Sequence, residues 1–173
     1  MDEDKLNEII KKASKVKLII IGVDGVLTDA GMYFNDRGDM LRKFNRRDGM
    51  GIQILKNYEI KSAIISSLNI PIVKNWAEFF GVDQLRLGSH DKFHEVEKLQ
   101  IRFGLELEEI AYISDDIDEF DILEKVGFGV TVSDGMKINK NKSAYVTKRK
   151  GGEGAVREVI ELIIASKEQL SIK

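Results

Sequence analysis

Hydrophobic and polar positions alternate in blocks along the chain. Short apolar runs of strand length are separated by longer stretches in which apolar residues recur at helical spacing. The runs that predict strands cover residues 16–23, 61–66, 84–87, 110–113 and 129–132. The helical stretches cover residues 48–58, 72–80, 92–103, 120–126 and 155–165. This order predicts a three-layer, Rossmann-like α/β fold with a parallel sheet and helices on both faces.

Residues 31–44 interrupt the alternation. Met32, Tyr33 and Phe34 precede the turn sequence at 35–38, and an apolar segment returns over 40–44. This pattern predicts a β-hairpin flap. Proline occurs once, and no linker or internal repeat is visible, so we expect residues 1–173 to form one domain without a large cap.

The composition argues against nucleic-acid binding, secretion and membrane insertion. The net charge of −2 gives no electrostatic reason to expect nucleic-acid binding. Cysteine is absent, which favours a reducing cytoplasm as the location. Residues 1–12 are too charged for a secretory signal, and no apolar run is long enough to cross a membrane.

Polar side chains gather where the predicted strands end. The first strand is followed by Gly22-Val23-Asp24-Gly25, the second by Ser66 and Ser67, and a later one by Asp115 and Asp116. Lys92 begins a predicted helix between them. In parallel sheets, sites form beyond the carboxyl ends of the strands. Carboxylates, hydroxyls and a lysine at that edge indicate a magnesium–phosphate pocket.

Each of these residues also has a plainer interpretation. Asp24-Gly25 could form only a turn, and the two serines could simply end a strand. The acidic run from Asp115 could be a helix N-terminus favoured by the helix dipole, and Lys92 could be a solvated lysine. Residues 137–150 are interpreted as a solvated loop, with a basic rim beside a phosphate pocket as the alternative.

Several motifs resemble a known family. Residues 23–29 (VDGVLTD) resemble the first motif of the haloacid-dehalogenase (HAD) phosphatases. Residues 44–51 (FNRRDGMG), 144–147 (AYVT) and 151–158 (GGEGAVRE) resemble one branch, the 3-deoxy-D-manno-octulosonate 8-phosphate phosphatases. That module is also found fused to acylneuraminate cytidylyltransferases. The resemblance covers nearly all of residues 16–164.

The resemblance implies a role for each matching residue. The general acid/base position falls on Asp24, and the nucleophile position falls on Gly22. The predicted phosphate- and substrate-binding residues are Ser66, Lys92, Arg47 and Asp48, and the predicted magnesium ligands are Asp24, Asp115 and Asp116. The branch forms homotetramers in which the hairpin of one subunit helps to close its neighbour's site. The apolar Met32, Tyr33, Phe34 and Met40 make such a homotetramer the expectation here.

The chain departs from the family pattern where the chemistry lies. A glycine at position 22 can neither attack phosphorus nor give a carboxylate oxygen to a metal. The second motif, usually Ser/Thr-Gly-Arg, reads Ser66-Ser67-Leu68 here. The fourth, usually Gly-Asp-Asp-x-Asn-Asp, reads SDDIDE at residues 114–119.

Two functions remain open. The first is a catalytically impaired relative with a structural or regulatory role, for which the resemblance implies a sugar-acid pathway such as lipopolysaccharide or nonulosonate biosynthesis. The second is an active Mg-dependent phosphatase for a phosphorylated 3-deoxy-keto-sugar acid, which would use water activated by Asp24 or Asp115 as its nucleophile. A nucleotide-binding Rossmann module is disfavoured, because no Gly-x-Gly-x-x-Gly follows the first strand.

Overall fold

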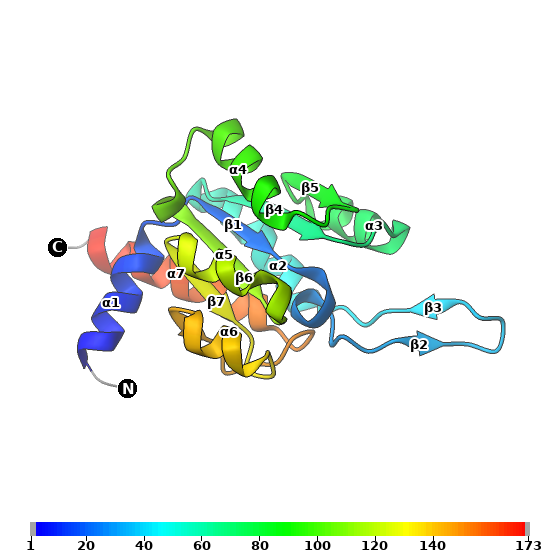
Figure 1. Ribbon diagram of the computed structural model, residues 1–173. Coiled ribbons are helices and arrows are strands. Elements are labelled where there is room, and N and C mark those ends of the chain that lie inside the picture. Colours follow the sequence, from blue (N-terminus) through cyan, green and yellow to red (C-terminus); the bar gives the residue numbers. More distant parts are fainter. Residues whose placement is uncertain (1–2, 172–173) are drawn as a thin grey trace.

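The computed structural model describes residues 3–171 and places a six-stranded parallel sheet at their centre (Figure 1). The strand order is β5-β4-β1-β6-β7-β8, so β1 lies between β4 and β6. The strands are β1 (Leu18–Ile21), β4 (Lys61–Ser66), β5 (Gln84–Leu87), β6 (Ile110–Ser114), β7 (Phe128–Thr131) and β8 (Tyr145–Val146). All strand pairs in this sheet are parallel, as predicted for strands joined by crossover helices.

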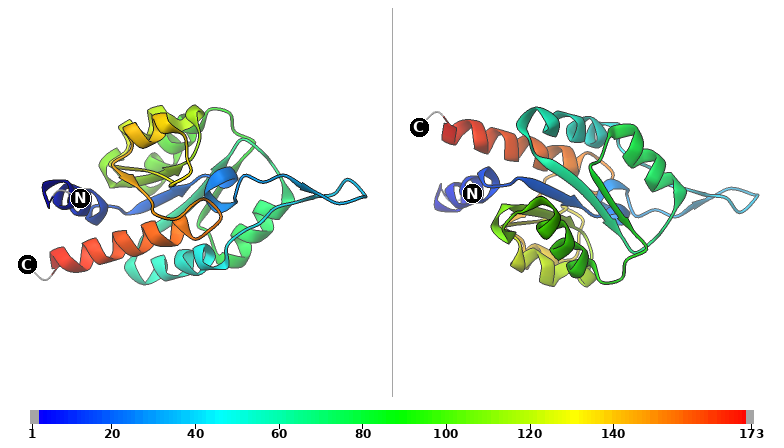
Figure 2. Two further views of the ribbon diagram at one scale, coloured as in Figure 1. Left: turned by 90° about the horizontal axis from the view of Figure 1, so that it is seen from below. Right: turned by 90° about the horizontal axis from the view of Figure 1, so that it is seen from above.

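Helices cover both faces of the sheet, which gives the three layers seen in Figure 2. One face carries α1 (Glu3–Ser14), α2 (Arg46–Leu55), α3 (Pro71–Phe80) and α7 (Ala155–Ser171). The other face carries α4 (Lys92–Phe103) and α5 (Phe120–Lys125), with α6 (Lys137–Lys142) beside α5. In β1, Ile19 and Ile21 pack towards the first layer, and Leu18 and Ile20 towards the second. Because both faces of β1 are buried, its sequence is continuously apolar instead of alternating.

The predicted hairpin is confirmed. Strands β2 (Tyr33–Phe34) and β3 (Met40–Leu41) pair antiparallel and extend away from the body of the molecule (Figure 1). An antiparallel bridge between Thr28 and Phe44 joins the two arms at the base. Outside the sheet and this flap, residues 3–171 contain no second sheet that could form a large cap.

The hydrophobic pattern located most of the other elements. The strand over 84–87 and the helix over 92–103 are confirmed to the residue, and the helix that begins at residue 155 runs on to 171. The interpretation of 137–150 as a solvated loop is wrong. This segment contains α6 and β8, and it buries Asn139 and Thr147, because β8 pairs with β7 at the edge of the sheet.

Helix α1 was not anticipated. It is largely polar, and its two buried residues, Ile9 and Ala13, lie against α7. No helix within residues 3–171 combines the length and the apolar character that are needed to cross a bilayer.

Candidate functional site

The carboxyl ends of β1, β4 and β6 surround a cavity of about 230 Å³. It brings together six of the eight residues proposed from the sequence, which are Gly22, Asp24, Ser66, Lys92, Asp115 and Asp116. Val23, Ala30, Ile65, Ser67, Asp118 and Glu119 complete the lining. The expectation that these residues meet at one edge of the sheet is therefore met by the fold.

The end of β1 is shaped by two glycines with different constraints. Gly22 has φ −66° and ψ 162°, a conformation open to any residue. A Cβ placed there would lie 3.2 Å from the Ile113 carbonyl oxygen and from the Val26 Cγ2, a tight contact that small shifts relieve. Gly25 has φ +72°, and a Cβ there would lie 1.8 Å from Oδ2 of Asp115. Position 22 can thus carry a side chain, whereas position 25 requires glycine.

The carboxylates lie at the end of β6. Burial, reinforced by the nearby Glu119 and Asp116 charges, raises the pKa of the Asp115 carboxyl to about 7. The Asp116 side chain turns back to accept a hydrogen bond from the Ile117 amide at 2.6 Å. Asp115 thus lies in an environment with uncompensated negative charge.

A buried asparagine braces this acidic loop. The Asn139 Nδ2 donates to the Ser114 Oγ at 2.9 Å and to the Asp116 carbonyl oxygen at 2.6 Å. The Thr131 hydroxyl donates to the Ser114 carbonyl oxygen at 2.8 Å. The sequence analysis missed Asn139, because it lies in the segment that was interpreted as a loop. The serine in place of the usual glycine at position 114 was the only local hint of this bond.

Lys92 is not a solvated lysine. Its side chain is 13% exposed, and its Nζ lies 2.8 Å from Oδ2 of Asp118 and 2.5 Å from Oε1 of Glu119. The hydroxyl of buried Tyr112 donates to the same Glu119 oxygen at 3.0 Å. Burial lowers the pKa of Lys92, but the two carboxylates outweigh it and the net shift is upward. Lys92 is therefore a charged group whose contacts are already made by protein carboxylates.

Arg42 is the second residue that the sequence analysis missed. It follows β3 on the returning arm of the hairpin, and its Nη1 forms an ion pair with Oδ1 of Asp24. The Arg42 side chain is only 6% exposed. Nothing in the local pattern distinguishes Arg42 from its neighbour Lys43, so only the folded chain could reveal the contact.

Arg47 and Asp48 do not line the cavity within one chain. Arg47 is exposed at the start of α2, while Asp48 is fully buried. The Asp48 Oδ1 accepts a hydrogen bond from the Arg157 amide at 2.7 Å, and its Oδ2 has no partner among the described residues. Burial raises the pKa of Asp48 to about 6, against the opposing effect of the Arg157 amide. Asp48 thus caps the start of α7, and the prediction that these two residues bind substrate gains no support from this placement.

The predicted magnesium ligands fit the metal in chemical type but not in number. Asp115 and Asp116 offer the hard oxygen ligands that magnesium prefers, and the raised pKa of Asp115 marks negative charge that a cation would offset. Within residues 3–171, however, no group of three or more His, Asp or Glu side chains is arranged to hold a metal ion. Position 22, where the resemblance leads us to expect a carboxylate ligand, is a glycine.

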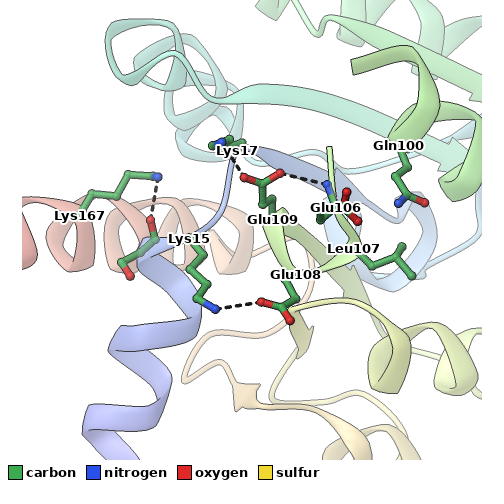
Figure 3. A pocket seen from close by; sticks show the side chains of 9 residues that line it. Lys15, Lys17, Gln100, Glu106, Leu107, Glu108, Glu109 and Lys167 are labelled. Atoms are coloured by element: carbon green, nitrogen blue, oxygen red, sulfur yellow. Dashed lines mark hydrogen bonds and ion pairs between the residues drawn. The ribbon is translucent and has the colours of Figure 1, made fainter. Parts of the chain in front are cut away.

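A larger hollow of about 750 Å³ lies at the opposite edge of the sheet, before β1 and β6 (Figure 3). Two of its lysines pair with glutamates, and a third, Lys167, donates to the Ser14 carbonyl oxygen. The Nζ of Lys15 lies 2.9 Å from Glu108, and that of Lys17 lies 2.6 Å from Glu109. It contains no serine–lysine–aspartate arrangement like that of the smaller cavity, so size alone does not identify the site.

Known proteins resemble the chain along nearly its full length. No model of a protein family matches the sequence. A relative from Yersinia pestis, named 3-deoxy-D-manno-octulosonate 8-phosphate phosphatase KdsC, is 35% identical over 164 residues, which cover 95% of this chain and 88% of the relative.

Two solved structures extend the comparison. A structure from Legionella pneumophila, described as a HAD superfamily (subfamily III A) hydrolase, is 34% identical, with a TM-score of 0.93 and coverage of 98% of this chain and 93% of the other. A 3-deoxy-D-manno-octulosonate 8-phosphate phosphatase from Moraxella catarrhalis, in complex with a magnesium ion, a phosphate ion and KDO, is 36% identical. Its TM-score is 0.90, with coverage of 96% of this chain and 95% of the other.

The parallel sheet with its hairpin flap is therefore the fold of the HAD superfamily. Within that superfamily, the identity and coverage of the relatives decide the branch. The chain belongs to the KdsC family of 3-deoxy-D-manno-octulosonate 8-phosphate phosphatases.

Proposed function

We propose that this chain is a KdsC-family protein with impaired phosphatase catalysis that retains a pocket for a small phosphorylated sugar acid or a related anion. The observation that carries the proposal is Gly22, which lines the cavity at the end of β1 and brings no carboxylate to it. By the resemblance, this is the position whose aspartate attacks phosphorus. Loss of a catalytic nucleophile typically lowers the rate by about 10⁴- to 10⁶-fold.

The neighbouring carboxylates are poorly placed to take over. Asp24 is ion-paired with Arg42, and Asp116 accepts a hydrogen bond from the amide of the next residue. Asp115 packs against Gly25. An ion-paired carboxylate is a weak nucleophile.

The binding groups of the pocket are better preserved. We assign Ser66 and Lys92 to the phosphoryl group, Asp24 to the general acid/base position, and Asp24, Asp115 and Asp116 to a weakly held magnesium ion. Magnesium would supply positive charge against the phosphoryl oxygens. The Moraxella relative holds magnesium, phosphate and KDO, which supports this class of ligand. Of the other two candidates, exposed Arg47 would reach substrate only in an assembly, and Asp48, buried within its own chain, would act only through the start of α7.

The proposed assembly is a homotetramer built through the hairpin. Met32, Tyr33, Phe34, Met40 and Leu41 are between 42% and 65% exposed, which is more contiguous apolar surface than a monomer usually shows. We further propose that this assembly has a structural or regulatory function. Its expected location is the cytoplasm, because the chain contains no cysteine. Light scattering that finds a monomer at every concentration would exclude the tetramer.

The decisive experiment compares hydrolysis of a panel of sugar phosphates, with magnesium, by the unmodified protein, Gly22→Asp and Gly22→Asn. Both side chains have the same shape, and the backbone at position 22 accepts them, but only aspartate supplies a carboxylate. We expect turnover by the unmodified protein and by Gly22→Asn to stay at background, and Gly22→Asp to gain on the order of 100-fold or more.

The alternative is an active phosphatase with water as its nucleophile, which family membership and the presence of Asp24 in the cavity favour. Turnover by the unmodified protein within the usual enzymatic range, about 1–10³ s⁻¹, would establish this alternative and refute impaired catalysis. If Gly22→Asp stays silent as well, the changes at Leu68 and in the 114–119 segment have also removed catalysis.

A further inference from the structure

The charges around the cavity are unbalanced. Its acidic lining consists of Asp24, Asp115, Asp116, Asp118 and Glu119, and its only lining cation is Lys92. The Lys92 ammonium is engaged by Asp118 and Glu119 at 2.8 and 2.5 Å. An anionic ligand therefore needs a further positive group, since the field of these carboxylates alone would repel it.

Arg42 places such a group beside the cavity. It does not line the hollow itself, but it forms an ion pair with Asp24, which does. Ala30, at the start of the outgoing arm of the hairpin, is also part of the lining, so the base of the flap borders the mouth. The hairpin thereby brings a guanidinium to the rim from a segment outside the central sheet.

The guanidinium of Arg42 has donors to spare. It carries five N–H groups in a planar fork. Its polar contacts among the described residues are the Asp24 carboxylate and, more weakly, the Met40 sulfur at 3.8 Å from Nη2. The side chain is 6% exposed, which fits an arginine that is paired with a carboxylate.

The next residue, Lys43, differs from Arg42 in exposure and in its partner. Lys43 is exposed, and its Nζ lies 3.6 Å from the Asp29 carboxylate, away from the lining of the cavity. Leu68, which follows β4 on the other side of the cavity, is apolar and 42% exposed and offers no charge. Among residues 3–171, Arg42 thus contacts a lining carboxylate and keeps several donors unused, whereas Lys92 already directs two of its three donors to Asp118 and Glu119.

We propose that Arg42 is an anion-binding residue of this site, whose guanidinium binds an oxyanion of the ligand, carboxylate or phosphate, beside Asp24 at the mouth of the cavity. The inference rests on the proposed function, in that it assumes a retained pocket for an anionic sugar. Arginine suits this task because its fork can donate two parallel hydrogen bonds to one carboxylate or phosphate. The hairpin would then contribute to ligand selection within its own subunit.

Calorimetric binding to the whole protein tests the inference without relying on catalysis. The probes are 6-phosphogluconate, which carries a phosphate and a carboxylate, and glucose 6-phosphate, which carries only the phosphate. They are titrated into the unmodified protein, Arg42→Gln and Arg42→Lys. Arg102→Gln, at an exposed position near the end of α4, removes the same charge away from the hairpin and serves as the matched control.

We expect Arg42→Gln to weaken binding by about 10- to 100-fold, the size of a lost charge-assisted interaction. Arg42→Lys should recover part of the affinity, and Arg102→Gln should bind like the unmodified protein. A loss confined to 6-phosphogluconate identifies the carboxylate as the bound oxyanion, and an equal loss for both probes identifies the phosphate. Circular dichroism spectra that match across the variants show that the effect is not misfolding.

Equal affinity of Arg42→Gln and the unmodified protein for both probes would overturn the inference and leave the proposed function standing. If neither the unmodified protein nor Gly22→Asp binds either probe, the retained pocket is wrong, and the role of Arg42 falls with it.

Discussion

The ends of β1 and β6 border the same cavity, but they contribute different groups to it. At the end of β1, position 22 is a glycine in an extended conformation and offers no side chain. At the end of β6, Asp115 and Asp116 line the cavity, and a hydrogen-bond network through Asn139 braces their loop. The backbone at the end of β1 does not depend on a side chain at position 22, because packing holds it. A Cβ at Gly151 would lie 1.8 Å from the Gly25 carbonyl oxygen, so the two segments are in close contact. The Gly152 amide donates a hydrogen bond to the Val26 carbonyl oxygen at 3.0 Å.

The difference shows that the backbone of this loop is held independently of the side chain at position 22. Residues that shape the loop are constrained by contacts with distant segments, whereas position 22 contributes only its backbone, through the hydrogen bond from its amide to the Ile113 carbonyl oxygen. Four predictions test this contrast, from the largest expected effect to the smallest.

The two glycines of the first motif should respond differently to the same added methyl group. Gly25→Ala combines a positive φ with a collision against the Asp115 carboxylate, so we expect the free energy of unfolding to fall by about 3–5 kcal/mol. Gly22→Ala, the matched control, should stay within about 1 kcal/mol of the unmodified protein. Urea unfolding measures both, and similar losses in the two variants would show that the β1 end is not shaped by packing at Gly25.

At the β6 end, removal of the Lys92 charge should be costly. In Lys92→Met, Glu119, which is 4% exposed, loses its cation, and we expect a loss of about 3 kcal/mol in the free energy of unfolding. Lys98→Met is the control, because Lys98 is 50% exposed, lies in the same helix and also pairs with a glutamate. The free energy of unfolding of Lys98→Met should fall by less than about 1 kcal/mol. An equally small loss in Lys92→Met would mean that the Lys92 charge does not stabilise the end of β6.

Asp48 links the start of α7 to the loop that supports the β1 end, and its effect should depend on pH. Its folded-state pKa of about 6 lies above the ordinary value of 3.8, so the folded state binds the proton more tightly than the unfolded state. The stability that Asp48 contributes is therefore highest below pH 4 and is lost as the pH rises towards 6, by about 2 kcal/mol.

Asp48→Asn should remove this dependence. We expect the variant to gain about 2 kcal/mol relative to the unmodified protein between pH 4 and pH 7, measured by urea unfolding at each pH. Asp36→Asn, at the exposed turn of the hairpin, should show no such relative gain. A constant difference between Asp48→Asn and the unmodified protein across this range would contradict the raised pKa.

The smallest effect is expected for Asn139→Leu, which removes the two hydrogen bonds donated to Ser114 and Asp116. Because each such bond contributes modestly and the Asn139 Oδ1 is itself unpartnered, we expect a loss of about 1 kcal/mol. Asn141→Leu, at an exposed position of α6, should be neutral. If the two variants are equally stable, the added network does not brace the β6 end.

Apart from α1, α6 and β8, the sequence by itself determined the order of strands and helices, the hairpin and the edge of the sheet at which the site lies. These follow from local patterns. The run at 84–87 and the apolar face of 92–103 record burial along a single element, and parallel strands bring their carboxyl ends to one edge. For that reason six of the eight proposed residues meet in one cavity.

Only the tertiary structure decided which partner each of these residues has. The Asp24–Arg42 pair, the Lys92 contacts with Asp118 and Glu119, and the bond between Asp48 and the Arg157 amide join residues from separate elements. Such contacts produce no periodic pattern in the sequence, because they depend on how the layers pack and on which side chains become buried together. Burial then sets their charge state and exposure, which is why Asp48 proves to be a helix cap at the base of α7 and Arg42 a neighbour of the cavity.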